Sequence, residues 1–198
     1  MAGKLRDALA MIGRMKIRLA AVVTAALLAS ATANAQTMDF ACPDPGTTFT
    51  YDSGTKVVAK GRDGMDCAME IVGGKPYKLR ALLFDNPSPD GRDMSAFIAA
   101  LRPERLWPLE VGKKIEARYS AGGQTWNYIL SVVRYEKRRG PGDAMIDTFL
   151  IEMQEQGSNG HRAVSRWWIS PADKYAIRFD FSDGAGKANR AVVTSVTR

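Results

Sequence analysis

The feature that most constrains this sequence is a run of alternating side chains near its C-terminus. Across residues 175–182, Tyr175, Ile177, Phe179 and Phe181 alternate with smaller or polar side chains. Successive side chains of a β-strand point to opposite sides, so this pattern is typical of a strand with one buried face. The same reasoning predicts further strands over residues 47–52, 55–60, 66–72, 75–84, 113–119, 126–136, 144–154, 162–169 and 190–197.

Short turns separate most of these strands. Parallel neighbours need crossover connections of about a dozen residues or more, so short turns favour antiparallel pairing. One helix is expected over about residues 93–102, where Asp93 can cap it and Phe97, Ile98 and Leu101 form its apolar stripe. The predicted fold class is mainly β: an antiparallel meander that forms a curved sheet or a partly closed barrel, with this one short helix.

The N-terminus has the three parts of a bacterial export signal. Basic residues are scattered over 4–18, an apolar run covers 19–29, and small residues occupy Ala33 and Ala35. The apolar run is about half as long as the roughly 20 residues that span a bilayer as a helix. We therefore predict that residues 1–35 are a cleaved signal peptide and that no transmembrane segment is retained.

Cleavage after Ala35 would leave residues 36–198 as a single β-rich domain in the periplasm. Translation could start at Met1 or at Met15, and the sequence does not decide between them. The whole chain has a formal charge of +7, but residues 36–198 hold 23 basic and 20 acidic side chains. A nucleic-acid-binding domain is usually strongly basic with its charges clustered. The sequence therefore predicts no nucleic-acid partner.

The two cysteines, Cys42 and Cys67, both follow the predicted signal peptide. In an oxidising compartment an even pair is most simply a disulfide. A redox or metal-binding pair would call for C-x-x-C spacing or nearby histidines, and the sequence has neither. We predict a structural disulfide, no metal and no cofactor.

Catalytic motifs are scarce. His161 is the sole histidine and follows a glycine turn, which favours an exposed turn residue over the base of a Ser–His or Cys–His hydrolase. Paired carboxylates are the other route to hydrolysis, as in glycosidases. The candidates lie on two neighbouring strands and their turn: Glu136, Asp143, Asp147, Glu152 and Glu155. Ion pairs on the wet face of a hairpin explain the same residues and are the favoured interpretation.

The strongest indication of a binding site is an aromatic and basic cluster around residues 162–178. Adjacent strand residues point to opposite faces, so Trp167 and Trp168 cannot both face the same core. One then faces solvent, a cavity or a partner, and Trp beside Arg is typical of glycan and anion sites. The alternative, given equal weight, is that a curved sheet or the helix buries both. The candidate ligand-binding residues are Trp167, Trp168, Arg166, Arg178 and Tyr175.

Several stretches between residues 105 and 182 resemble exported β domains of proteobacteria grouped as DUF3108-like. The matching stretches are 107–112, 132–136, 143–152, 167–171 and 175–179; a Gly140–Pro141–Gly142 turn replaces the group's usual one. The resemblance implies an envelope location and a β-sheet fold, and it brings no catalytic residues.

These observations predict a periplasmic, non-enzymatic β module that binds an envelope component, whether lipid, glycan or protein partner. The alternatives are a carboxylate-dependent envelope hydrolase and a structural or oligomerising envelope subunit, with the oligomeric state left open. If the sheet curls, an apolar cavity is expected to be lined by Trp126, Tyr128, Leu130, Phe179 and Phe181.

Overall fold

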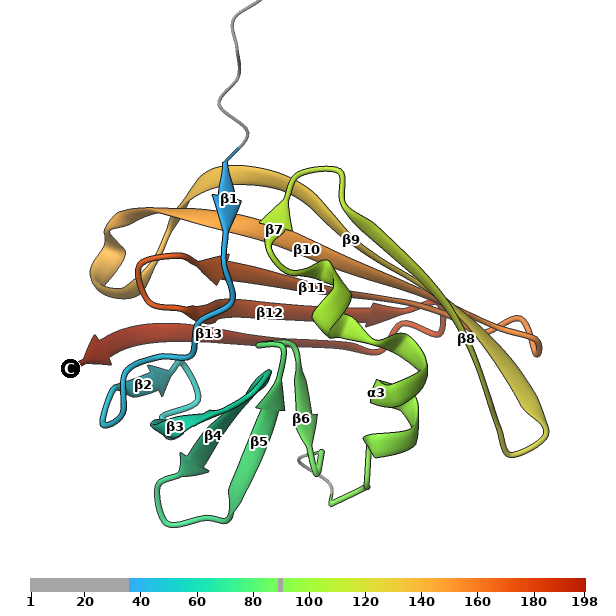
Figure 1. Ribbon diagram of the computed structural model, residues 1–198, viewed down its shortest axis with the longest axis horizontal. Coiled ribbons are helices and arrows are strands. Elements are labelled where there is room, and N and C mark those ends of the chain that lie inside the picture. Colours follow the sequence, from blue (N-terminus) through green and yellow to red (C-terminus); the bar gives the residue numbers. More distant parts are fainter. Residues whose placement is uncertain (1–35, 89–90) are drawn as a thin grey trace, which may run out of the picture. The chain divides into compact units, whose positions relative to one another are not determined.

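A sheet of eleven strands dominates the computed structural model, which describes residues 36–88 and 91–198 (Figure 1). The strand order is β6-β5-β4-β3-β2-β13-β12-β11-β10-β9-β8, and every neighbouring pair is antiparallel. The two edges, β6 and β8, are not paired with each other. The predicted fold class is therefore confirmed in its open form, because the sheet does not close into a barrel.

The strands are longest in the C-terminal half. Their bounds are β2 Thr48–Tyr51, β3 Lys56–Asp63, β4 Asp66–Ile71, β5 Pro76–Arg80, β6 Phe84–Asn86, β8 Lys114–Ala121, β9 Gln124–Arg139, β10 Met145–Gly157, β11 Arg162–Ser170, β12 Tyr175–Asp183 and β13 Ala188–Thr197. A separate two-stranded sheet pairs β1 (Thr37–Met38) with β7 (Leu109–Glu110). The predicted signal peptide, residues 1–35, lies outside the described residues, and its cleavage stays a prediction.

The sheet consists of two meanders joined by β2 and β13, the first and last of its own strands. Strands β2–β6 follow one another, as do β8–β13, and the pairing of β2 with β13 connects the two groups. Figure 1 shows β4–β6 turned steeply away from β9–β13. The core lies between the two groups: Phe49 of β2 stacks on Tyr175 of β12, and Phe84 of β6 meets Trp167 of β11.

The helix α3 (Ser95–Leu101) lies within the predicted span. The Asp93 carboxylate accepts the Ser95 backbone N–H at 2.8 Å, which satisfies one of the free donors at the helix start. Phe97, Ile98 and Leu101 are buried, as the apolar stripe predicted. Arg102 adopts a left-handed conformation and ends the helix before the 3₁₀ turn η1 (Pro103–Leu106).

Several strand boundaries differ from those predicted by two or three residues, and one predicted strand is divided in two. The expected strand 75–84 is a hairpin, because Ala81 and Leu82 take φ angles of 53° and 60° and turn the chain. Such turns usually carry Gly or Asn, but this one is buried and apolar, so no turn signal marks it in the sequence. Strand β9 continues to Arg139, three residues beyond the predicted end, because Lys137–Arg139 pair with Met145–Asp147.

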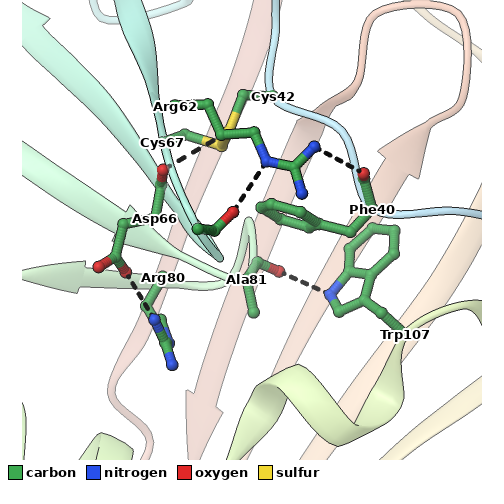
Figure 2. The surroundings of a disulfide bond; sticks show 9 residues. Phe40, Cys42, Arg62, Asp66, Cys67, Arg80, Ala81 and Trp107 are labelled. Carbon is green, nitrogen blue, oxygen red and sulfur yellow. Dashed lines mark hydrogen bonds and ion pairs between the residues drawn. A yellow bond between two sulfur atoms is a disulfide. The ribbon is translucent and has the colours of Figure 1, made fainter.

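The predicted disulfide joins Cys42 to Cys67 of β4 (Figure 2). Beside it, Arg62 donates to the Gly64 and Phe40 carbonyls at 2.8 and 3.5 Å, and its guanidinium lies over the Phe40 ring. Phe40 in turn meets Trp107 edge to face. The disulfide and these contacts attach the extended segment before β2 to the first meander.

The residues expected to line an apolar cavity mostly belong to the packed core. Leu130 is fully buried, and Tyr128 packs edge to face on Phe97 with ring centroids 5.1 Å apart. Phe179 and Trp126 are partly buried against the same core. Phe181, the fifth, borders a surface hollow described below.

Candidate functional site

The two faces of the β9–β13 sheet carry different chemistry, and the strand register assigns each residue to one face. One cross-strand row runs Arg134, Leu150, Trp168, Arg178 and Val192. The neighbouring row, on the opposite face, runs Val132, Ile151, Trp167, Phe179 and Ala191. We call the first the outer face and the second the core face.

Trp167 is a core residue. Its side chain is 6% exposed, and its ring centroid lies 5.5 Å from that of Phe84 and 5.3 Å from that of Phe179. These are edge and tilted contacts of the kind that aromatic pairs favour in protein interiors. Trp167 therefore joins β11 to β6, across the two halves of the large sheet.

Trp168 points to the outer face and is nevertheless only 4% exposed. The guanidinium carbons of Arg138 and Arg178 lie 4.1 and 5.0 Å from the centre of its ring. Its indole N–H donates to the Glu136 carboxylate at 2.8 Å. The structure thus matches the alternative in which a curved sheet buries both tryptophans, and the expectation of one exposed Trp is wrong.

The curvature that covers Trp168 comes from the end of the β9–β10 hairpin. The register of β9 and β10 shifts between Leu150 and Ile151, where Val133 is the additional residue. Such a bulge bends a strand and increases its twist. Beyond it, the 3₁₀ turn η2 (Pro141–Asp143) packs against β13, which is three strands from β10 in the sheet order. Figure 1 shows this hairpin end bending out of line with β11 and β12.

Ion pairs cover much of the outer face. Arg134 and Arg166 meet Glu136 and Glu152, each at 2.7 Å. Arg178 forms a two-contact ion pair with Asp180. Burial alone would raise the pKa of Glu136, but hydrogen bonds from Arg134 and Trp168 hold it below its usual value.

This arrangement does not support the hydrolase alternative. Burial would raise the pKa of Glu152 as well, but hydrogen bonds from Gln154 and Arg166 lower it. A glycosidase needs one carboxylic acid whose pKa is raised. Glu155 does have a raised pKa, caused by burial, and the His161 imidazole lies 3.7 Å from its carboxylate.

The remaining two candidates for a carboxylate pair are also ion-paired. Arg139 lies 3.4 Å from Asp143, and Lys137 lies 3.1 Å from Asp147. Together with Glu136, Glu152 and Glu155, all five carboxylates have a basic neighbour within ion-pair distance. This is the pattern of charge pairs on a wet hairpin that the sequence favoured.

Two surface hollows open on the outer face, and Arg190 of β13 borders both. The larger, about 410 Å³, lies between the hairpin end and β13. Its lining residues are Arg138, Arg139, Gly140, Gly142, Asp143, Arg178, Arg190, Val192, Val193 and Thr194. The smaller, about 360 Å³, is lined by Arg166, Asp180, Phe181, Ser182, Ala188, Asn189 and Arg190.

Tyr175 belongs to a different and buried cluster. Its hydroxyl lies 2.8 Å from that of Tyr51 and also interacts with Tyr77. Asp85 lies close enough for its charge to act on Tyr51 and Tyr77, and burial raises the pKa of Asp85 to about 6. Burial likewise raises the pKa of Tyr51 to about 12. We call these four residues the tyrosine cluster.

The candidate ligand-binding residues therefore separate into three places. Arg166, Trp168 and Arg178 share the outer face, Trp167 is in the core, and Tyr175 is in the tyrosine cluster. Their role in ligand binding stays a prediction. Sequence reasoning did not select Arg138 or Arg190, although both border the larger hollow.

Within residues 36–88 and 91–198, no group of three or more His, Cys, Asp or Glu side chains is arranged to hold a metal ion. The helices of this part of the chain are all too short or too polar to cross a membrane.

Comparison with known proteins gives little further information. No protein-family model and no curated protein matches the sequence. Among solved structures, the chain is similar to the hypothetical lipoprotein YmcC of Escherichia coli K12, with 8% identity and a TM-score of 0.42 over 77% of this chain and 84% of that one. A likeness of this strength carries no functional argument. The resemblance to DUF3108-like domains stays a prediction.

Proposed function

We propose that this protein is an exported, non-enzymatic binding module of the bacterial envelope, and that its ligand binds the outer face over Trp168. The disulfide and the export signal in the sequence support the location, because structural disulfides persist in oxidising compartments such as the periplasm. The observation that carries the proposal is the larger hollow, where arginines from the hairpin end face arginines of β12 and β13.

Preorganisation supports a binding role for this face. Arg138 and Arg178 are held against the Trp168 ring, and their side chains are only 25% and 24% exposed. Arginines fixed in this way lose less conformational entropy when a ligand binds than free surface arginines do. The hollow volume, about 410 Å³, falls within the range of about 300–1,000 Å³ that is usual for small-ligand sites.

The structural-subunit alternative has weaker support. The edge strand β8 is the natural place for another chain to add a strand. Its exposed side chains include Lys114, Glu116 and Arg118, and charged edge residues discourage such pairing. Molar mass by size-exclusion chromatography with light scattering separates a monomer from an assembled subunit.

Native mass spectrometry tests the proposal on protein expressed with its own N-terminus and purified from the periplasm. We expect a chain starting at Gln36, lighter by two hydrogen atoms than its reduced form, with a bound adduct. The adduct should be lost in Arg190→Gln and kept in Arg118→Gln, because Arg118 is an exposed arginine on β8 that borders neither hollow. A wild-type protein without any adduct, or an adduct indifferent to Arg190, would contradict the proposal.

A further inference from the structure

The charges around the larger hollow do not balance. Arg134 and Arg138 share one carboxylate, Glu136, at 2.7 and 3.8 Å. Arg178 is paired with Asp180, and Arg139 with Asp143. Arg190 has no ion pair within the described residues. Five arginines therefore face three carboxylates, which leaves an excess of two positive charges.

Two of these arginines share one aromatic ring. Arg138 and Arg178 come from different strands, and both guanidinium groups lie over the ring of Trp168. Burial first, and the charge of Arg178 second, lower the pKa of Arg138. An anion in contact with both groups would relieve this repulsion and would replace the water lost when the hairpin end covers Trp168.

The arginine donors come from two sides of the hollow. Arg138 and Arg139 belong to the hairpin end, while Arg178 and Arg190 belong to β12 and β13. All four line the same hollow, and Asp143 is the sole carboxylate among its lining residues. A group bound there would meet arginines on opposite sides, which suits an anion with several acceptor oxygens.

We infer that the larger hollow binds a phosphate group, with Arg138, Arg178 and Arg190 as its main donors. This inference rests on the proposed function, since it names the chemistry of the ligand that the outer face takes. A carboxylate carries one charge and is satisfied by a single two-contact arginine, as Asp180 is by Arg178. A phosphate monoester carries about −1.5 to −2 charges at pH 7 and offers three strong acceptor oxygens. It matches both the excess charge and the number of donors.

A phosphate monoester is present in soluble phosphates and in the headgroup of phosphatidic acid, and the experiment separates these sources. In one arm, inorganic phosphate is titrated into the folded protein, and the arginine Nε–H signals are followed by NMR, with acetate as the matched carboxylate. In the other arm, sedimentation is measured with vesicles of phosphatidylcholine alone and with added phosphatidic acid. Both arms compare wild type, Arg190→Gln and the control Arg118→Gln.

We expect wild type and Arg118→Gln to bind phosphate, or the vesicles that contain phosphatidic acid, and Arg190→Gln to bind at least about tenfold more weakly. Loss of one charge-assisted hydrogen bond has an effect of this size. Acetate should bind wild type about tenfold more weakly than phosphate, because it fills only part of the donor set. Arg190 is exposed and unpaired, so its variant should keep the thermal unfolding curve of wild type.

The outcomes separate this inference from the proposed function. If neither phosphate nor anionic vesicles bind, while the periplasmic adduct still depends on Arg190, then the ligand is not a phosphate and the binding function stands. If the adduct is also absent, both are wrong. Equal binding by Arg118→Gln and Arg190→Gln would overturn the site even if phosphate binds elsewhere on the protein.

Discussion

Trp167 and Trp168 are neighbours in sequence and almost equally buried, at 6% and 4% exposure, yet different kinds of side chain cover them. Aromatic rings surround Trp167, whereas arginine side chains and one carboxylate cover Trp168. Long basic side chains can cover apolar surface with their stems while their charged ends reach water. Low exposure therefore marks a core residue on one face and a polar surface site on the other.

Carboxylates in the two environments differ in the same way. Asp85, in the tyrosine cluster, has a raised pKa because it is buried and has no arginine partner among the described residues. Glu136, on the outer face, has a lowered pKa because Arg134 and Trp168 donate hydrogen bonds to it. An ionised carboxylate is therefore destabilised in the tyrosine cluster and stabilised on the outer face. Substitutions in the two environments should therefore have different effects.

Trp167→Ala should have the largest effect. It leaves a cavity between β11 and β6 beside Phe84 and Phe179, and such substitutions lower the free energy of unfolding by about 3–5 kcal/mol. Urea unfolding followed by circular dichroism measures the change. A loss below about 1 kcal/mol, as is usual for surface positions, would mean that Trp167 does not join the two halves of the sheet.

Asp85→Asn should stabilise the protein at neutral pH. Burial raises the pKa of Asp85 in the folded protein to about 6, above its ordinary value of 3.8, so the wild type loses stability as pH rises from about 4 to about 6 and keeps that penalty at higher pH. The shift corresponds to about 3 kcal/mol, which the variant would recover at pH 7–8 and not below pH 4. Unfolding free energies at pH 3.5, 5 and 7.5 measure it.

The matched control is Asp93→Asn. The pKa of this exposed carboxyl is lowered by its hydrogen bonds from Ser95, so its contribution to stability has the opposite sign and is lost as pH falls. If the unfolding free energies of wild type and Asp85→Asn differ by the same amount at every pH, the pKa of Asp85 is not raised in the folded protein, and this prediction is wrong.

Trp168→Phe keeps a ring under Arg138 and Arg178 and removes the indole N–H. The Glu136 carboxylate then loses the donor at 2.8 Å, and a hydrogen bond to a charged group contributes about 1.5–3 kcal/mol. The pKa of Glu136, measured by carboxyl NMR, should rise toward its ordinary value. Trp167→Phe is the control on the core face and should leave that pKa unchanged; a rise in both variants would break the distinction between the faces.

Arg166→Gln should have the smallest effect on stability. The Arg166 side chain in its ion pair with Glu152 is 42% exposed, and exposed ion pairs contribute about 0.2–1 kcal/mol to the free energy of unfolding. The pKa of Glu152 should rise, since Arg166 is one of the groups that lower it. An unfolding free energy reduced by more than about 2 kcal/mol would mean that the ion pairs of the outer face hold the fold together.

Much of the fold could be predicted because its signals are local. The stripe of Phe97, Ile98 and Leu101 predicts α3, and the alternation of residues 175–182 predicts β12. The buried turn at Ala81 and Leu82 could not be predicted, since apolar residues at positive φ carry no turn signature. The site was predicted in part: period-two spacing places Trp168, Arg166 and Arg178 on one face once strands β11 and β12 are paired.

Tyr175 shows why the remainder of the site was missed. The register of β11 and β12 shifts between Trp168 and Ile169, with Ile177 as the additional residue. The alternation of residues 175–182 already places Tyr175 on the face opposite Arg178, and its partner Tyr51 comes from another strand, β2. A single additional residue changes which side chains are neighbours across a sheet, and nothing in the alternation of residues 175–182 indicates it.

Local patterns specify the strands, the helix and the two cysteines that pair, because alternation, capping and cysteine number act through near neighbours in the chain or through covalent chemistry. The tertiary structure alone sets the pairing of β2 with β13, the meeting of Arg138 and Arg190 at one hollow and the place of Asp85 among tyrosines. These contacts depend on strand register, bulges and the bend of the β9–β10 hairpin, which bring together residues that no local pattern connects.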